Sequence, residues 1–407
     1  MHDLTSFGLT VLLVAAALSA ALLASKLGAR VSVPSAALFL VAAAIASDLF
    51  PSLTLSIKTV ERVGTIALVV ILFDGGSSIG LRRFRVVAVP IAALGILGTF
   101  VTAGAIALFA HWALGFGWVF AGLLGSAIAP TDPAVMFSVL GQREIGGRPG
   151  TILEGESGAN DPVGIALTIG MIELATHADA TFWIVVRIFV EQMTIGLAFG
   201  ILGGLVERWA QQRISLPSSG LHTIRTLALA GLVYGAATVA HGSGFLAVFV
   251  AGLIAGGVSA PFSSEIAAFQ DGLSTLAEIV VFVALGLTID LSTLTASRWA
   301  EGLALAAVAA LAARPLAILP LLAPSTLRRS EKAFIVWGGL KGAVPILLAA
   351  FALGEGVEHG AQIYELVFVV VLASVVVQGG TIAWAARRLG IESRGSTPRA
   401  ARAGSAP

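Results

Sequence analysis

Four stretches of this 407-residue chain run for more than twenty residues without a charged side chain. They comprise 22 residues between Asp3 and Lys26, 46 between Arg85 and Asp132, 39 between Arg225 and Glu265, and 21 between Glu365 and Arg387. A helix needs about 20 apolar residues to span a bilayer. The runs therefore predict a multi-pass protein of the lipid bilayer, and the two longest can each form a helical hairpin.

The composition agrees with this class. Hydrophobic residues make up 57% of the chain, charged residues 12%, and the mean hydropathy is +0.96, whereas about a quarter of a soluble domain is charged. The net charge of +1 gives no reason to expect a nucleic-acid partner. Cysteine is absent, which excludes disulfides and thiol chemistry, and no cofactor is expected. The first apolar run has no basic segment before it, so we expect a retained span and not a cleaved signal.

Glycine, proline and charge clusters divide the chain into thirteen expected spans. They lie near 4–25, 31–48, 59–80, 86–110, 118–140, 150–174, 180–206, 222–241, 243–259, 272–290, 299–322, 333–354 and 361–386. With the N-terminus outside, the inner loops and the tail hold 18 of the 24 Lys and Arg residues. This bias follows the positive-inside rule and predicts a cytoplasmic C-terminus. Residues 391–407 are expected to be a disordered basic tail.

Two of these spans are interrupted near their middle. The fifth reads "GSAIAPTDPAVMFS", with Pro130 and Pro133 around Thr131 and Asp132, and the twelfth reads "WGGLKGAVPILLA", with three glycines and a proline around Lys341. Proline removes a backbone donor and disrupts the helix before it. Unwound backbone at membrane depth is tolerated where it is buried in protein or lines a cavity. We therefore expect two discontinuous helices.

The interruptions recur at a fixed spacing. Thr131 and Lys341 are 210 residues apart, and so are Gly76 and Gly286. In the expected topology the two members of each pair lie on helices that run in opposite directions. Paired breaks in oppositely oriented halves are typical of inverted-repeat secondary transporters.

A group of carboxylates lies in the sixth span, "LEGESGANDPVGIALT" at 153–168. Counted from Gly150, Asp161 lies about 16 Å along the helix, about half of a 30 Å hydrocarbon core. By the same rise Thr131 and Lys341 lie about 20 and 12 Å from their own helix starts. The three residues therefore converge near the midplane. The spacing i, i+3, i+7 places three side chains on one helix face: Glu154, Ser157 and Asp161.

A carboxylate buried in the membrane must be paired, protonated or bound to a cation. Glu154 is expected to be solvated near the inner end, Glu156 to neutralise a buried arginine, and Asp132 to cap a half-helix. No comparable partner stands beside Asp161 in the sequence, although Asn160 can donate or accept. One carboxylate that holds a proton and a cation in turn would exchange one for the other, so Asp161 is the predicted carrier.

The chain also resembles a known family, the bacterial monovalent cation:proton antiporters of the NhaP or cell-volume-regulation type, which are related to the animal sodium/proton exchangers. The resemblance covers about residues 4–390. Five ordered segments carry it: "LFDGG" at 72–76, "APTDP" at 129–133, "GESGAND" at 155–161, "ARP" at 313–315 and "GGLKGAVPI" at 338–346.

The resemblance implies an all-α antiporter fold of thirteen helices with two crossed discontinuous helices. Transport helices near 59–174 and 272–386 would work beside a dimerisation scaffold, in a homodimer of the bacterial inner membrane. Asp161 would bind the ion and the proton, with oxygen ligands from Thr131 and Ser157 and support from Asn160. Glu156 would pair with Arg314. The Asn-Asp form implies electroneutral exchange of sodium or potassium for a proton.

Two positions depart from the family pattern. Lys341 stands where the family usually has arginine, and a lysine in an apolar site loses its proton more easily. Asp74 of "LFDGG" stands where relatives have Glu or Asp, and it is a candidate outer ligand with Asp132.

Two other functions compete with antiport. A cation channel would also use acidic residues, but paired broken helices favour alternating access. An intramembrane hydrolase would use Ser157 and His241, but Ser157 lacks the Gly-x-Ser-x-Gly elbow of such enzymes.

Overall fold

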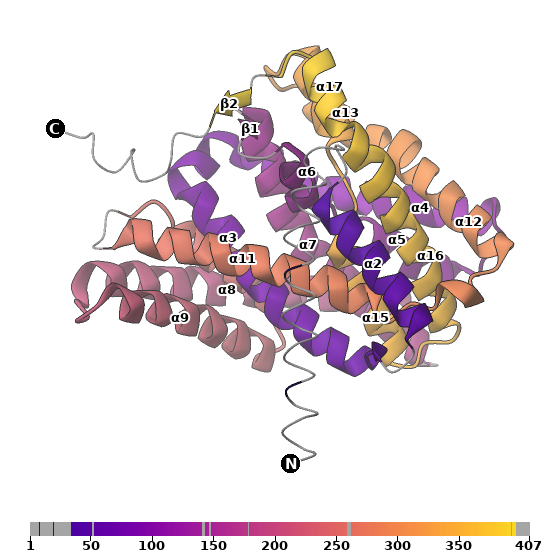
Figure 1. Ribbon diagram of the computed structural model, residues 1–407, viewed down its shortest axis with the longest axis horizontal. Coiled ribbons are helices and arrows are strands. Elements are labelled where there is room, and N and C mark those ends of the chain that lie inside the picture. Colours follow the sequence, from indigo (N-terminus) through magenta and orange to yellow (C-terminus); the bar gives the residue numbers. More distant parts are fainter. Residues whose placement is uncertain are drawn as a thin grey trace.

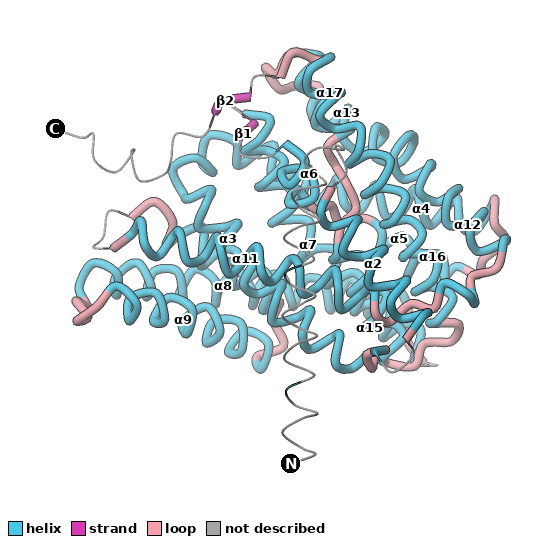
Figure 2. Tube along the Cα trace, in the orientation of Figure 1, coloured by secondary structure: helices cyan, strands magenta, loops and turns pink. Residues whose placement is uncertain are grey.

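The computed structural model describes residues 34–50, 53–140, 143–145, 148–177, 179–258, 262–391 and 393–395, with residues 8 and 19. Apart from residues 8 and 19, the expected span 4–25 lies outside this part, as do the basic residues Lys26 and Arg30 and the tail beyond residue 395. Figure 2 shows that helices joined by short loops make up nearly all of the described trace.

Helices account for almost every described element. In chain order they are α2 (Ser35–Leu49), α3 (Ile57–Ala92), α4 (Thr99–Trp112), α5 (Trp118–Ile128), α6 (Pro133–Leu140), α7 (Arg148–Thr176), α8 (Phe182–Arg213), α9 (Ser219–Val239), α10 (Gly244–Ala255), α11 (Ser263–Gly286), the 3₁₀-helix η3 (Leu291–Thr293), α12 (Ala296–Val308), α13 (Arg314–Leu322), α14 (Arg329–Trp337), α15 (Ala343–Gly354), α16 (Gly360–Ala373) and α17 (Gly380–Arg388). Within the described part of the chain, five helical stretches are long and apolar enough to cross a membrane: Ile57–Trp112, Phe182–Arg213, Ser263–Gly286, Ala296–Leu322 and Gly360–Arg388. Each expected span after the first contains helix.

Two short strands depart from the purely helical expectation. β1 (Arg143–Ile145) lies between α6 and α7 and pairs antiparallel with β2 (Ser393–Gly395). β2 belongs to the tail that the sequence predicts to be disordered. The pairing with β1 satisfies backbone groups of its three residues, and the disorder of the tail stays a prediction.

Both predicted helix breaks are present. Residues 129–132 separate α5 from α6, and residues 338–342 separate α14 from α15. The span before each broken helix contains a π-helical segment, Ala93–Gly98 (η2) before α4 and Ala309–Ala313 (η4) before α13. A third, Ser374–Gly379 (η5), joins α16 to α17. Such wide turns inside α-helices are frequent at functional sites.

The two halves of the repeat pack through equivalent glycines. A methyl group on Gly76 of α3 would overlap the backbone of α10 at Phe249 and Leu253. A methyl group on Gly286 of α11 would overlap the backbone of α2 at Leu40 and Ala44, which lie 209 residues before Phe249 and Leu253. In each half a helix therefore packs against a helix of the other half, α3 against α10 and α11 against α2, so that the two halves interlock.

The helices form two groups around the two discontinuous helices, α5–α6 and α14–α15. In Figure 1, α8, α9 and α11 lie together at the lower left, α4, α5, α12 and α16 lie at the right, and α6 and α7 lie between them. α3 packs along α10 and α11, whereas α15 and α12 pack on α16. The interface between the groups contains the residues described next.

Candidate cation site

The two unwound segments cross and bond directly to each other. The Asp132 backbone N–H donates to the Leu340 carbonyl at 2.8 Å. Lys341 Nζ donates to the carbonyl oxygens of Ala129 at 2.7 Å and Pro130 at 3.2 Å. These carbonyls follow the last turn of α5, where the helix dipole is negative. The buried Lys341 ammonium group is therefore held at the carbonyl end of one half-helix.

An opposite charge lies at the start of the other half-helix. The Asp132 carboxylate lies directly against Gly342, the residue before α15, so closely that a methyl group on Gly342 would overlap it. The first amides of a helix lack partners inside that helix and favour negative charge. Asp132 and Lys341 therefore compensate opposite ends of the crossing.

Each unwound segment is also held by a polar side chain from the following span. Asn160 Nδ2 donates to Thr131 Oγ1 at 2.8 Å, and the Thr131 N–H donates to Asn160 Oδ1 at 3.3 Å. In the other half, the Lys341 N–H donates to Ser374 Oγ at 2.8 Å, and that hydroxyl donates to Gln378 at 2.7 Å. These bonds satisfy backbone donors that have left the helix.

A buried ion pair lies beside the crossing. Arg314 and Glu156 are 3% and 1% exposed and form a bidentate pair. Arg314 also donates to the Ile335 carbonyl near the end of α14 at 3.1 Å. Gly339 passes so close that any side chain there would overlap the guanidinium. The pair thus fixes α7 and α13 to the end of α14.

A cavity of about 440 Å³ reaches the crossing from one side. Asp161 lines it and is 4% exposed, and its Oδ1 accepts no hydrogen bond from any residue that the structure describes. The Ser157 hydroxyl lies within hydrogen-bonding reach of Asp161, and the charged groups that act on Asp161 are Asp132 and Lys341. The polar side chains that line the cavity come from α2, α3, the unwound segment before α6, α7 and α11: Ser35, Asp74, Ser78, Asp132, Glu154, Ser157, Asp161, Asp271, Ser274, Thr275 and Glu278.

Only some of the residues singled out from the sequence face this cavity. Asp161, Ser157, Asp132 and Asp74 line it. Thr131 and Asn160 are bonded to each other and are not among its lining residues. Glu156, Arg314 and Lys341 lie within the surrounding protein. Thr131 therefore does not face the cavity beside Asp161 and Ser157.

Sequence reasoning missed two groups of polar residues. Ser374 and Gln378 support the Lys341 segment, but nothing in their local sequence connects them to a residue more than thirty positions away. The α11 residues were detectable, since "QDGLSTLAEI" at 270–279 places polar side chains at helical spacing inside a predicted span. His241, in contrast, lies just after α9 and does not line the cavity.

The two ends of the cavity differ. Ser78 is shared with a larger pocket whose walls carry four arginines, Arg82, Arg83, Arg85 and Arg208. At the opposite end Gly64 faces Leu347 of α15, and a side chain on Gly64 would strike that leucine. The cavity therefore adjoins the arginine-lined pocket at Ser78, and α3 and α15 are in close contact at Gly64 and Leu347.

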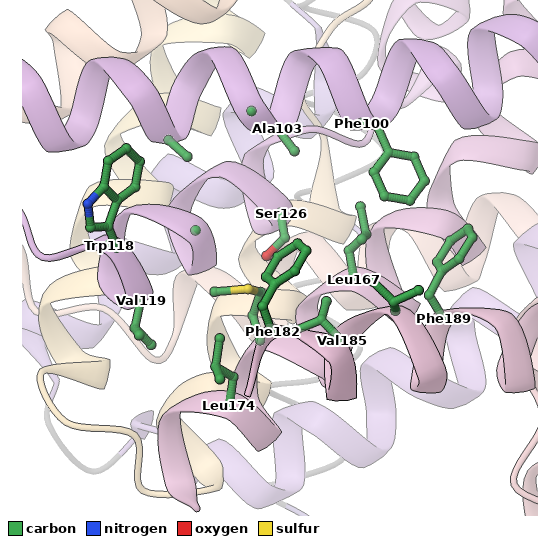
Figure 3. Close-up of a pocket in the computed structure, with 15 residues that line it drawn as sticks. Phe100, Ala103, Trp118, Val119, Ser126, Leu167, Leu174, Phe182, Val185 and Phe189 are labelled. Carbon is green, nitrogen blue, oxygen red and sulfur yellow. The ribbon is translucent and has the colours of Figure 1, made fainter. Parts of the chain in front are cut away.

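A second, apolar cavity of about 580 Å³ lies between α4, α5, α7 and α8. Figure 3 shows Phe100, Phe182, Phe189 and Trp118 around it, with the Ser126 hydroxyl among them. The described residues that line it include no charged side chain. It lacks the ligands that a dehydrated cation needs, so the Asp161 cavity is the candidate ion site.

Comparisons with known proteins agree with this geometry. The family model of the sodium/hydrogen exchanger transmembrane region matches residues 13–388. The chain is 36% identical over 391 residues to the K⁺/H⁺ antiporter NhaP of Alkalimonas amylolytica, a match covering 95% of this chain and 68% of that protein. It is 34% identical over 376 residues to the K⁺/H⁺ antiporter NhaP2 of Shewanella sp. (strain ANA-3), covering 91% of this chain and 65% of that protein. The chain thus spans about two thirds of the length of these relatives.

A solved structure shows the same fold. The sodium proton antiporter MjNhaP1 from Methanocaldococcus jannaschii superposes with a TM-score of 0.80 at 22% identity, covering 95% of this chain and 100% of that chain. The match of the family model over most of the sequence, together with the two relatives, is decisive. This chain belongs to the transmembrane sodium/hydrogen exchanger family.

Proposed function

We propose that this chain exchanges a monovalent cation for a proton across the bacterial inner membrane by alternating access, one ion for one proton. One observation carries the proposal: Asp161 Oδ1 is buried at the wall of a polar cavity without a hydrogen-bond partner among the described residues. A carboxylate in this position is stable when it is protonated or bound to a cation. Because one group serves both substrates, loading one requires release of the other.

The charges at the crossing support one-for-one coupling. Two basic side chains face three carboxylates there: Arg314 and Lys341, with Glu156, Asp132 and Asp161. Arg314 is paired with Glu156, and Lys341 and Asp132 compensate opposite half-helix ends. One negative charge is left, at Asp161. A single proton or a single monovalent cation neutralises it, so exchange is electroneutral.

The proposal includes thirteen membrane crossings with the N-terminus outside and the C-terminus inside. Its support is the helix within each expected span after the first, and the arginines beside the cavity mouth, which the positive-inside rule assigns to the inner face. The cavity then opens inward, and the contact of Gly64 with Leu347 is the outer barrier. Exposure of Asp161 to the outside requires this contact to separate.

The packing also suggests which helices move. We assign α4–α7 and α12–α17 to the transport unit, and α2, α3 up to Gly80, and α8–α11 to the scaffold. Gly80 has a φ of 63° and interrupts α3, which separates its scaffold part from the part leading into α4. This unit is narrower than the ranges 59–174 and 272–386, because α3 and α11 pack on α10 and α2. The homodimer stays a prediction, which crosslinking in membranes would test.

The test is transport in proteoliposomes. Wild-type protein is expected to take up a cation, with saturation, in exchange for protons. Asp161→Asn should abolish exchange and leave the protein folded, whereas Asp179→Asn, in an exposed loop, should leave exchange unchanged. Proton-coupled exchange retained by Asp161→Asn would overturn the site, and uncoupled cation conductance would establish the channel alternative.

The cation itself is the open part of the proposal. The two relatives are named for potassium/proton antiport and the solved structure for sodium/proton antiport. We propose potassium as the first candidate, because the relatives with the higher identity carry that name, with sodium and lithium as alternatives. Dequenching of a pH-sensitive dye on addition of lithium, sodium, potassium or rubidium ranks them directly.

A further inference from the structure

A polar stripe runs along the scaffold wall of the cavity. Four α11 side chains line it at the spacing i, i+3, i+4, i+7: Asp271, Ser274, Thr275 and Glu278. This spacing places them on one face of the helix. α11 is among the stretches apolar enough to span the membrane. Polar residues on such a helix are costly unless they face protein or a water-filled path, and here they face the cavity.

The stripe leads from the cavity mouth to the crossing. Asp271 is exposed, and its neighbour Gln270 lines the arginine-walled pocket and accepts a hydrogen bond from Ser77 at 3.2 Å. Glu278 lies seven residues further, about 10 Å along the helix axis. There it faces Asp132, which also acts electrostatically on Asp161. Glu278 and Asp161 therefore lie on opposite walls of the cavity, with Asp132 near both.

No described basic side chain compensates Glu278. Asp132, another carboxylate, is the charged neighbour that acts on it. A purely structural glutamate in a helix bundle would have a basic partner, as Glu156 has Arg314. Here the same cavity also contains the unpartnered, buried Asp161 Oδ1. Glu278 thus adds a carboxylate without a basic neighbour, among the described residues, to the cavity that Asp161 lines. An uncompensated carboxylate in such a cavity attracts a cation.

We infer that Glu278 is a second cation-binding carboxylate, a transfer site that a hydrated monovalent cation occupies between the inner pocket and Asp161. The inference rests on the proposed exchange activity and extends it to a residue on the opposite wall. Ser274 and Thr275 supply hydroxyl oxygens beside the path. Since Asp161 alone performs the exchange, Glu278 sets how readily the inner-face cation is captured and leaves the stoichiometry unchanged.

The expected effect is on cation affinity. A carboxylate about 4 Å from a cation contributes an attraction that corresponds to about five- to tenfold in affinity when water fills the surroundings. Glu278→Gln retains the shape and removes the charge. It should raise the KM for the cation about five- to tenfold at the inner face, and leave the maximal rate and the outer-face KM unchanged.

Everted and right-side-out membrane vesicles that contain the full chain separate the two faces. The matched control is Glu265→Gln, which removes the same charge from an exposed position at the start of the same helix that lines neither polar cavity. This control should leave both KM values unchanged. Glu278→Asp, which retains the carboxylate, should restore most of the inner-face affinity.

The outcomes are distinct. A higher inner-face KM with a normal maximal rate supports the transfer site. An unchanged KM, an equal rise at both faces, or loss of the maximal rate in a folded protein overturns it. If Glu278→Gln is not recovered folded, Glu278→Asp with Thr275→Val decides: lower inner-face affinity in the second variant supports the path, and wild-type affinity refutes it. If the wild-type protein shows no exchange, the proposed function fails and not this inference.

Discussion

Breaking the buried ion pair of Glu156 and Arg314 should destabilise the protein without changing which groups bind the ion. Removing one partner leaves the other charge buried and uncompensated, which typically costs about 3–5 kcal/mol. Arg314→Met also loses the bond to the Ile335 carbonyl, about 1 kcal/mol more. Glu156→Gln should therefore lower the free energy of unfolding by about 3–4 kcal/mol, and Arg314→Met should lower it by about 4–6 kcal/mol.

These energies correspond to measurable melting shifts. With an unfolding entropy of about 2 cal/mol/K per residue over 407 residues, 4 kcal/mol lowers the Tm by about 5 °C. The assay is thermal unfolding of purified protein in detergent, with loss of the native peak on size exclusion as the readout. Glu191→Gln is the control, since its pair with Arg187 is exposed and spans 3.8 Å, and should cost less than about 1 kcal/mol.

The double variant Glu156→Gln with Arg314→Met decides the reasoning. Because neither side chain is charged in the double variant, it should recover most of the stability that the single variants lose. The coupling energy between the two positions should then be at least about 2 kcal/mol. If the double variant is as unstable as the sum of the single variants, the two side chains act independently. Wild-type melting of both single variants would also refute the pair as a stabilising contact.

The other predictions concern the crossing. The methyl group added by Gly342→Ala should overlap the Asp132 carboxylate and lower both the Tm and the exchange rate. The control is Gly231→Ala, because Gly231 has open space around it. Normal transport by Gly342→Ala would show that the close contact is dispensable. In proteoliposomes, a potential imposed with valinomycin should leave the wild-type exchange rate unchanged, because one charge enters for each that leaves. A clear voltage dependence that disappears in Lys341→Arg would instead show that the lysine gains and loses a second proton.

Much of the architecture could be predicted because it depends on local chemistry. The prolines at 130 and 133 and the glycines around Lys341 cannot continue a helix, so the breaks are visible in the sequence. Helix rise alone predicts a position near the midplane for Asp161, and this stays a prediction. The 210-residue spacing also identified Gly76 and Gly286, which turn out to occupy equivalent contacts in the two halves.

The rest depends on tertiary contacts that no local pattern specifies. The ligand role of Thr131 stays a prediction, and the two hydrogen bonds that join Thr131 to Asn160 come from a span 29 residues further along the chain. The supporting bond from Ser374 to Lys341 joins spans that come together only in the folded bundle. β1 and β2 are three residues each and lie about 250 residues apart, too short to show a strand period.

The interlocked glycines have a consequence for biogenesis. When the ribosome has completed α2 and α3, the helices against which they pack have not been made, because Gly76 requires α10 and Gly286 of α11 requires α2. The first half must therefore remain inserted but incompletely packed until more than 250 residues have been synthesised. An N-terminal half expressed alone should be degraded in the membrane, whereas co-expression with the second half should protect both fragments. Assembly of this protein is in that sense a late event, which follows insertion of α10 and α11.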